Sequence, residues 1–165
     1  MNILKIQMGC IPLISLFLLQ NSIAQSIPAT LLKDLRGNSV ATKSLLEKDQ
    51  PTIISFWATW CKPCLQEIKA IDENLQNWQK ETNVKFIAIS VDDSRSKSRV
   101  PSFVNARKWN FDVLIDENGD FQRAMNVLNV PHTFILDKNG KIIYQHSSFA
   151  LGDEEEYFKV LKSFQ

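Results

Sequence analysis

Cysteine is scarce in this sequence. The 165 residues contain three cysteines, Cys10, Cys61 and Cys64. Small secreted domains that depend on disulfides for their stability are much richer in cysteine, so the sequence does not belong to that class. The few sulfur atoms that are present are therefore candidates for chemistry instead of cross-linking.

The sequence also lacks a long basic block, internal repeats and low-complexity segments. Its 19 Lys and Arg residues against 18 Asp and Glu residues give a formal net charge of +1 at pH 7. Basic and aromatic side chains are not interleaved as in nucleic-acid-binding surfaces, so we expect no nucleic-acid partner. The length and the hydrophobic content of 44% indicate one globular domain with a substantial core.

The apolar run near the N-terminus, Ile11–Leu19, is too short to span a membrane. A positive charge precedes it, and Ser22 and Ala24 follow as the small residues of a cleavage site. This pattern predicts a secretory signal peptide over residues 1–24 and a separate domain over residues 25–165. We therefore expect an exported protein of the periplasm or the cell envelope.

Two alternatives remain open for this N-terminal segment. It can stay uncleaved as an anchor, which would be the only membrane contact of the protein. Gly9-Cys10 weakly resembles a lipoprotein signal, but Cys10 precedes the apolar run instead of following it. Cleavage would remove Cys10 and Lys5, which leaves 18 of the 19 basic residues against 18 acidic residues.

The strongest functional signal is Cys61-Lys62-Pro63-Cys64. The apolar residues 52–57 predict a buried strand directly before it, and a helical pattern follows. This spacing places Cys64 one turn after Cys61, at a separation that a disulfide can bridge. The positive end of the helix and Lys62 favour the thiolate of Cys61, and Pro63 suits the first turn. The pattern predicts a redox pair with Cys61 as the nucleophile; half a zinc site or an inert pair is the alternative.

Strand and helix patterns alternate along the rest of the chain. Residues 84–91 are almost entirely apolar, as in a central strand that is buried on both faces. With the strand at 52–57 and the helix between them, they form a right-handed βαβ unit. The predicted strands are 29–35, 40–41, 52–57, 84–91, 111–115, 130–136 and 141–146, and the predicted helices are 45–47, 61–80, 100–109, 121–128 and 153–164. The most charged stretch, residues 92–99, is interpreted as a solvated loop, with contact to an acidic partner as the alternative.

Residues 56–64, Phe-Trp-Ala-Thr-Trp-Cys-Lys-Pro-Cys, resemble the active-site stretch of the thioredoxin superfamily. The Ala-Thr-Trp triplet resembles its exported TlpA/ResA-like branch of bacterial thiol-disulfide reductases. The hairpin pattern near the start and the insertion at 111–128 also resemble that branch, so the similarity covers most of the chain after about residue 26. It implies an α/β thioredoxin-like fold, with a central mixed β-sheet, helices on both faces and an N-terminal β-hairpin.

The resemblance also implies a substrate-docking surface. Val130-Pro131, before a strand, resembles the cis-proline loop that faces the two cysteines in this fold. The role implied for Val130 is to pair its backbone with an extended substrate segment. Trp60 is expected beside the nucleophile, together with Lys62 and Pro63; packing of Trp60 in the core is the alternative.

The resemblance is incomplete at two positions and suggests one more functional residue. Ser55 stands where thioredoxins carry a buried aspartate, so the usual proton acceptor for Cys64 is missing there. Glu67 matches an acid of the TlpA/ResA branch and is a candidate for proton transfer, with a solvated surface glutamate as an equal alternative. Lys69 stands where many relatives have a helix proline, so no kink is assured at that position.

The implied function is an exported thiol-disulfide oxidoreductase that reduces protein disulfides through a Cys61–Cys64 cycle, with no other cofactor and no resident metal. Its substrates would be protein disulfides, such as those of cytochrome c apoproteins, and a membrane thiol protein would supply electrons. The alternative from another class is a metal-handling module that binds copper or zinc through Cys61, Cys64 and His132. A peroxidase is disfavoured because Thr59 lies two residues before Cys61, where a peroxidase needs three.

Overall fold

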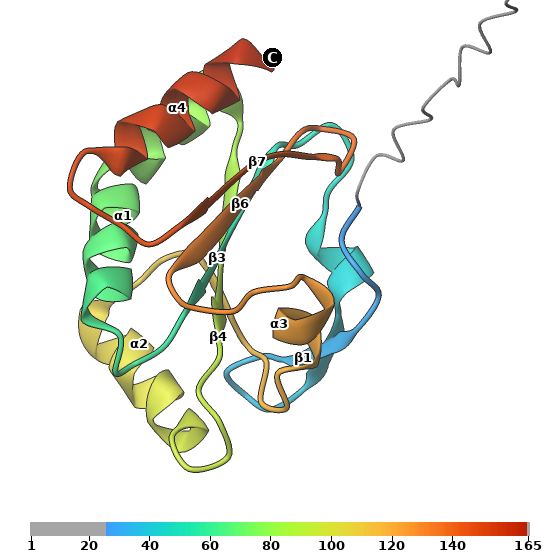
Figure 1. The fold of residues 1–165 in the computed structure, drawn as a ribbon, viewed down its shortest axis with the longest axis vertical. Helices are drawn as coiled ribbons and strands as arrows, with labels where there is room; N and C mark the ends of the chain where they lie inside the picture. The colour runs from blue at the N-terminus through green and yellow to red at the C-terminus, as the bar shows by residue number, and fades with distance from the viewer. Residues whose placement is uncertain (1–25, 165) are drawn as a thin grey trace, which may run out of the picture.

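The computed structural model describes residues 26–164, which form one mixed sheet and its covering helices (Figure 1). The strands are β1 (Leu31–Lys33), β2 (Ser39–Ala41), β3 (Thr52–Trp57), β4 (Lys85–Ser90), β5 (Asp112–Ile115), β6 (His132–Leu136) and β7 (Ile142–Ser147). The helices are α1 (Lys62–Thr82), α2 (Val100–Arg107), α3 (Asp120–Ala124) and α4 (Asp153–Ser163), with 3₁₀ turns η1 (Thr42–Leu45) and η2 (Lys97–Arg99).

The sheet has the strand order β2-β1-β5-β4-β3-β6-β7. The three central strands, β3, β4 and β5, run parallel, whereas β6 and β7 are antiparallel additions on one side. The hairpin of β1 and β2 pairs antiparallel with β5 on the other side. The central strands are buried along nearly their whole length, which explains their continuous apolar sequence. The predicted mixed sheet and N-terminal hairpin are confirmed.

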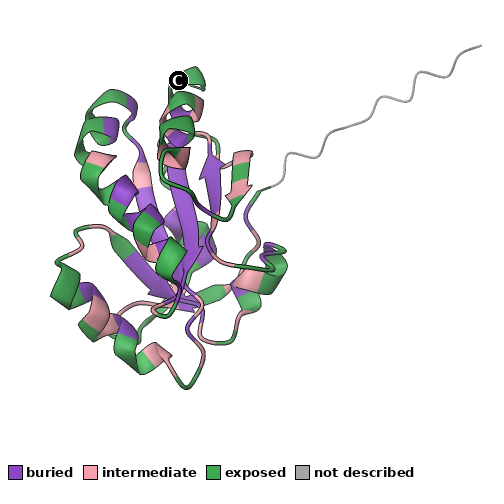
Figure 2. Ribbon diagram, turned by 60° about the vertical axis from the view of Figure 1, so that its left-hand side comes forward, coloured by how far each residue is buried: buried purple, intermediate pink, exposed green. Residues whose placement is uncertain are grey.

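Alternate side chains of β3 pack into two separate cores, one on each face of the sheet. Ile53 and Trp57 belong to the core under α1, α2 and α4, and Ile54 and Phe56 belong to the core under α3 and the N-terminal hairpin. Figure 1 shows these helix groups on opposite sides of the sheet. Figure 2 shows the buried strands enclosed by helices whose outward sides are exposed. The prediction of helices on both faces is therefore confirmed.

Several element boundaries differ from the prediction for local reasons. Helix α1 begins at Lys62 because Cys61 is its N-cap, with extended backbone angles of φ −90° and ψ 96°. Helix α3 ends at Ala124, shortly before Asn126, whose φ of 56° is incompatible with a continuing helix. The short helix predicted at 45–47 is instead the turn η1, which lies a few residues earlier.

Helix α1 is continuous over 21 residues. It is not interrupted at Lys69, the position where many relatives have a proline. Lys69 is exposed on its surface and pairs with Glu73. Within residues 26–164, no helix combines the length and the apolar character that a membrane crossing requires. The predicted signal peptide lies outside the described residues.

Candidate active site

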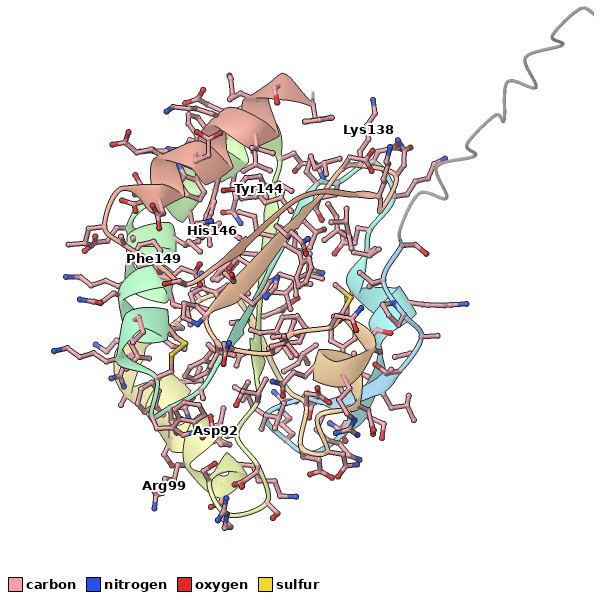
Figure 3. All side chains as sticks on the ribbon, viewed as in Figure 1. Asp92, Arg99, Lys138, Tyr144, His146 and Phe149 are labelled. Carbon is pink, nitrogen blue, oxygen red and sulfur yellow. A yellow bond between two sulfur atoms is a disulfide. The ribbon has the colours of Figure 1, made fainter. Side chains whose placement is uncertain are left out.

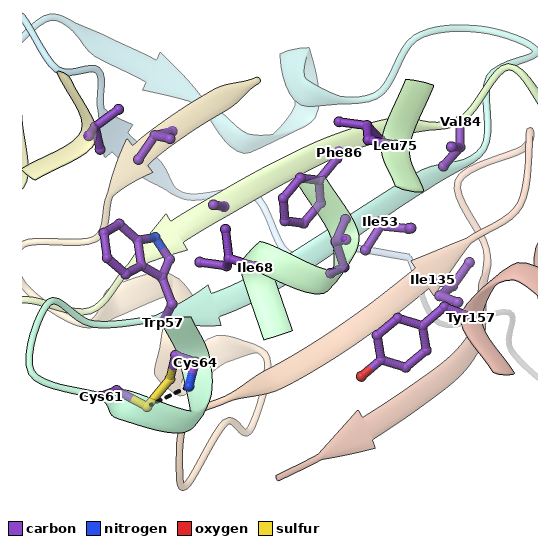
Figure 4. Close-up of a cluster of buried hydrophobic side chains, with 14 of the residues drawn as sticks. Ile53, Trp57, Cys61, Cys64, Ile68, Leu75, Val84, Phe86, Ile135 and Tyr157 are labelled. Carbon is purple, nitrogen blue, oxygen red and sulfur yellow. Dashed lines mark hydrogen bonds between the residues drawn. A yellow bond between two sulfur atoms is a disulfide. The ribbon is translucent and has the colours of Figure 1, made fainter. Parts of the chain in front are cut away.

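Cys61 and Cys64 form a disulfide at the N-terminus of α1, with their Cα atoms 5.3 Å apart (Figure 4). The strand β3 ends at Trp57, and the chain turns through residues 58–60 before Cys61. Cys61 remains 5% exposed, whereas Cys64 is completely buried. Of the two cysteines, Cys61 is therefore the more accessible from solvent.

The local electrostatics favour a negative charge on Cys61. The backbone N–H of Cys64 points at Cys61 Sγ over 3.3 Å, and the positive end of the 21-residue helix lies at the same place. Lys62 is exposed and has no carboxylate partner among residues 26–164. These groups favour the thiolate over the thiol form of Cys61 once the disulfide is reduced. Pro63 lies in the first turn, where a backbone donor is not needed.

The loop before β6 faces the disulfide. The Val130–Pro131 bond is cis, as predicted, and the carbonyl oxygen of Val130 lies 3.7 Å from Cys61 Sγ. Val130 itself lies outside the paired part of β6. Beside this loop is a cavity of about 360 Å³, whose lining includes Pro63, Val130, Pro131 and His132.

The two tryptophans before the cysteines differ completely in environment. Trp60 is 67% exposed next to Cys61, so the alternative that it packs in the core is wrong. Trp57 is completely buried, and its ring centroid lies 5.6 Å from that of Phe103 and 5.1 Å from that of Trp109. Trp60 is thus available to a substrate, whereas Trp57 fixes the position of α2.

Glu67 is completely buried, so the alternative of a solvated surface glutamate is wrong. Its carboxylate accepts hydrogen bonds from the hydroxyls of Ser55 at 2.7 Å, Thr133 at 2.9 Å and Tyr157 at 2.7 Å. Burial raises the pKa of Glu67 above its ordinary value, and the three hydroxyl bonds oppose that rise. Burial also raises the pKa of Tyr157, and the neighbouring Glu67 adds to that rise.

This network explains the serine at position 55. Ser55 donates its hydroxyl hydrogen to Glu67, which approaches from α1, three residues after Cys64. A carboxyl group from the helix therefore lies in hydrogen-bond contact with the strand residue at position 55. The sequence could not identify Thr133 and Tyr157 as partners, because they lie 66 and 90 residues away from Glu67.

A second buried carboxylate, Asp92, was not predicted. It accepts hydrogen bonds from the backbone N–H of Thr59 at 2.8 Å, the Thr59 hydroxyl at 2.6 Å and the Ser90 hydroxyl at 2.8 Å. The interpretation of 92–99 as a solvated loop is wrong for this residue. A signal existed, because β3 and β4 are parallel and their carboxyl ends meet at one edge of the sheet, where a polar residue after each strand can interact.

The metal-handling alternative finds no ligand set in the structure. Within residues 26–164, no three His, Cys, Asp or Glu side chains are placed to hold a metal ion together. His132 stacks on Phe134, with ring centroids 4.6 Å apart, and burial lowers its pKa below the ordinary value. Its side chain hydrogen-bonds with Gln145, and its buried Nε2 atom has no hydrogen-bond partner among the described residues.

A disulfide that caps a helix after a central parallel strand, opposite a cis-proline loop, defines a thioredoxin-like redox protein. The model of the AhpC/TSA family matches residues 23–145. The thiol-disulfide oxidoreductase ResA of Bacillus thuringiensis is 31% identical over 138 residues, which are 83% of this chain and 77% of the relative. The chain therefore belongs to the AhpC/TSA family and is a thiol-disulfide oxidoreductase.

Solved structures agree with this assignment. A thioredoxin-like protein from Porphyromonas gingivalis has a TM-score of 0.75 and 45% sequence identity, and the match covers 84% of this chain and 90% of that one. A thiol:disulfide interchange protein of the DsbE type from Chlorobium tepidum has a TM-score of 0.73 at 24% identity, over 85% of this chain and 95% of that one. The second likeness, at this identity, concerns the fold alone.

Proposed function

We propose that this protein is an exported reductase of protein disulfides, which acts through a cycle of the Cys61–Cys64 pair. The observation that carries the proposal is the asymmetry of the pair. Cys61, under the positive end of α1, keeps 5% of its surface exposed, whereas Cys64 is completely buried. One cysteine is placed to attack and the other to resolve.

The two sulfurs of the protein and the disulfide of the substrate account for every covalent bond that forms or breaks in the reaction. The thiolate of Cys61 attacks one sulfur of the substrate disulfide, which forms a mixed disulfide and releases the other substrate sulfur as a thiolate. Cys64, as a thiolate, then attacks Cys61 Sγ and releases the second substrate sulfur. Two electrons pass from the protein dithiol to the substrate, and the Cys61–Cys64 disulfide is restored.

The groups around Cys61 are suited to hold an extended substrate segment. The backbone of Val130 is outside the paired sheet, so it can form strand-like hydrogen bonds to the substrate. The exposed Trp60 and Pro63 provide apolar contacts on either side of the nucleophile, and Lys62 provides a positive charge. Pro131 fixes the loop opposite the sulfurs.

Glu67 is the proposed proton acceptor for Cys64. The two residues lie on neighbouring turns of the same helix face, and both are completely buried. A buried carboxyl group with a raised pKa exchanges protons more readily near neutral pH than a surface carboxylate does. The hydroxyls of Ser55, Thr133 and Tyr157 bind the charged form and can also turn to accept a proton from the neutral form.

The proposed export rests on the predicted signal peptide at residues 1–24, and export in turn determines where the electrons must come from. An exported reductase needs a source of electrons outside the cytoplasm, which would be a thiol protein of the membrane. Substrates would be protein disulfides in the periplasm or cell envelope, including the cysteines of cytochrome c apoproteins. Cleavage after Ala24 would release residues 25–165 as the active domain.

The redox potential of the Cys61–Cys64 couple tests the direction of the reaction. A reductase should equilibrate with glutathione or dithiothreitol at a strongly reducing potential, in the range of about −270 mV that is typical of thioredoxin. A potential near about −120 mV, as in strong protein oxidants, would overturn the reductase role while leaving the oxidoreductase chemistry intact.

A further inference from the structure

A second groove adjoins the active site on the side of Trp60. It has a volume of about 390 Å³ and lies between the loop that carries Trp60 and the segment that follows β4. Its lining consists of Trp60, Val91, Asp93, Arg95, Ser96 and Arg99. The groove is therefore continuous with the residue that stands directly before the nucleophile.

Both walls of this groove are held in place by hydrogen bonds within the protein. The buried Asp92 joins them, because it accepts hydrogen bonds from Thr59, on the wall of Trp60, and from Ser90, at the end of β4. The opposite wall is closed by Asp93, whose carbonyl oxygen accepts hydrogen bonds from the N–H groups of Ser96 and Lys97. The shape of the groove therefore does not depend on a ligand.

The charges of the groove do not cancel. Arg95 pairs with Asp93 at 2.7 Å, and Lys97, which is outside the lining, pairs with Glu117. Arg99 is exposed and has no carboxylate partner among residues 26–164. Figure 3 shows Arg99 and Asp92 at the same end of the molecule. The groove thus combines a free guanidinium group with an exposed indole ring.

The cavity on the other side of the disulfide has a different character. Its lining, which includes Leu128, Val130 and Pro131, contains no Lys, Arg, Asp or Glu. A substrate segment that crosses Cys61 therefore meets a positive, aromatic groove on one side and an uncharged cavity on the other. A segment with negative charge on the flank that enters the positive groove should therefore bind better than one with positive charge there.

We propose that the groove beside Trp60 binds an acidic flank of the protein substrate, with a carboxylate on Arg99 and the adjoining apolar part of the chain on Trp60. This inference deepens the proposed function and rests on it, because it names the substrate class of the same site. The guanidinium contact acts on docking. It raises kcat/KM mainly by lowering KM and leaves the exchange step between sulfurs unchanged.

The test compares two peptide disulfides that differ only in their flank, which carries two glutamates in one peptide and two lysines in the other. The reduced protein is mixed with each peptide, and kcat/KM for reduction is measured at low ionic strength. We expect the glutamate peptide to be reduced about five- to tenfold more efficiently, which is the size of effect that exposed ion pairs and like-charge repulsion produce together. The preference should decline in high salt.

Two charge reversals identify the responsible residue. Arg99→Glu should abolish or invert the preference. Lys138→Glu makes the same change of charge in the turn between β6 and β7, at the opposite end of the molecule (Figure 3), and should leave the preference unchanged. Both variants change the net charge of the protein by the same amount and are assayed with the same two peptides. A difference in preference between them therefore reflects neither net charge nor the intrinsic reactivity of a peptide.

The possible failures are distinct. No preference in the wild-type protein, or an equal loss in both variants, would overturn the acidic-flank proposal while leaving reduction of protein disulfides intact. Failure to reduce either peptide, by a protein whose cysteine pair still cycles with dithiothreitol, would instead overturn the proposed function, and the groove proposal with it.

Discussion

Two buried carboxylates lie near the redox pair in the fold, Glu67 on the helix that carries Cys64 and Asp92 bonded to Thr59 in the loop before Cys61, and their partners differ. Asp92 accepts one hydrogen bond from a backbone N–H and two from hydroxyls, whereas Glu67 accepts three from hydroxyls. The backbone N–H of Thr59 can only donate, so it ties Asp92 to the main chain of the loop before Cys61. A hydroxyl can donate or accept, so it tolerates either protonation state of its partner.

The two carboxylates also differ in what they connect and in their pKa shifts. Asp92 joins the loop before Cys61 to the end of β4, and thereby fixes where Trp60 and Cys61 lie. Glu67 follows Cys64 in a surrounding that raises its pKa and accommodates the neutral form. We infer that Asp92 holds the site in shape, whereas Glu67 exchanges protons during turnover.

The largest expected effect is the loss of stability in Asp92→Ala. The variant leaves the Thr59 backbone N–H and two hydroxyls without their partner, and we expect a cost of about 3 kcal/mol in the free energy of unfolding. Asp92→Asn retains an acceptor for the backbone donor and should lose only about 1 kcal/mol. Urea unfolding of the oxidised protein measures both. A loss below about 1 kcal/mol in Asp92→Ala would show that Asp92 does not hold the loop.

The next effect concerns the rate at which Cys64 resolves the mixed disulfide. Glu67→Gln keeps the shape of the side chain but removes the proton acceptor, so we expect resolution at pH 7 to be about a hundredfold slower. The deficit should disappear at high pH, where hydroxide deprotonates Cys64. Rapid-quench alkylation measures the decay of the mixed disulfide. Asp92→Asn is the matched control, and an equal slowing in that variant would remove the distinction between the two carboxylates.

A smaller effect is expected for Tyr157→Phe. It removes one of the three hydrogen bonds to Glu67 and should cost about 1 kcal/mol in the free energy of unfolding. It should also raise the pKa of Glu67 further, because the lost bond favours the carboxylate. Tyr144→Phe is the control, since that ring packs against Tyr157 but its hydroxyl makes no hydrogen bond to Glu67. If Tyr144→Phe changed the free energy of unfolding and the Glu67 pKa by the same amount, the effect would come from ring packing and not from the hydrogen bond.

The smallest expected effect is a slope of stability against pH. The pKa of Glu67 is higher in the folded protein than in the unfolded chain, so the folded state binds more protons between those two values. Stability should therefore fall as pH rises from about 4.3, the ordinary pKa of glutamate, through the folded pKa. Urea midpoints across this range should show the decline in the wild type and a weaker one in Glu67→Gln. Identical slopes would mean that the Glu67 pKa is not raised.

The sequence predicts best what depends on neighbouring residues. The disulfide, the helix that follows it and the strand before it are all contained within residues 52–82, and the cis bond at Pro131 follows from a local resemblance. The burial of Glu67 and Asp92 depends on contacts between distant segments. From the sequence alone, Glu67 resembles any other helix residue, because its partners Thr133 and Tyr157 are distant in the chain. Asp92 likewise resembles the other residues of a charged loop, because its partner Thr59 belongs to another segment.

The central claim is that Cys61 attacks and Cys64 resolves. The direct measurement is mass spectrometry of single-cysteine variants after reduction and incubation with a peptide disulfide. We predict that Cys64→Ser accumulates a stable mixed disulfide on Cys61, whereas Cys61→Ser forms little under the same conditions. A mixed disulfide that forms equally well on Cys64 in Cys61→Ser, or in neither variant, would contradict this account.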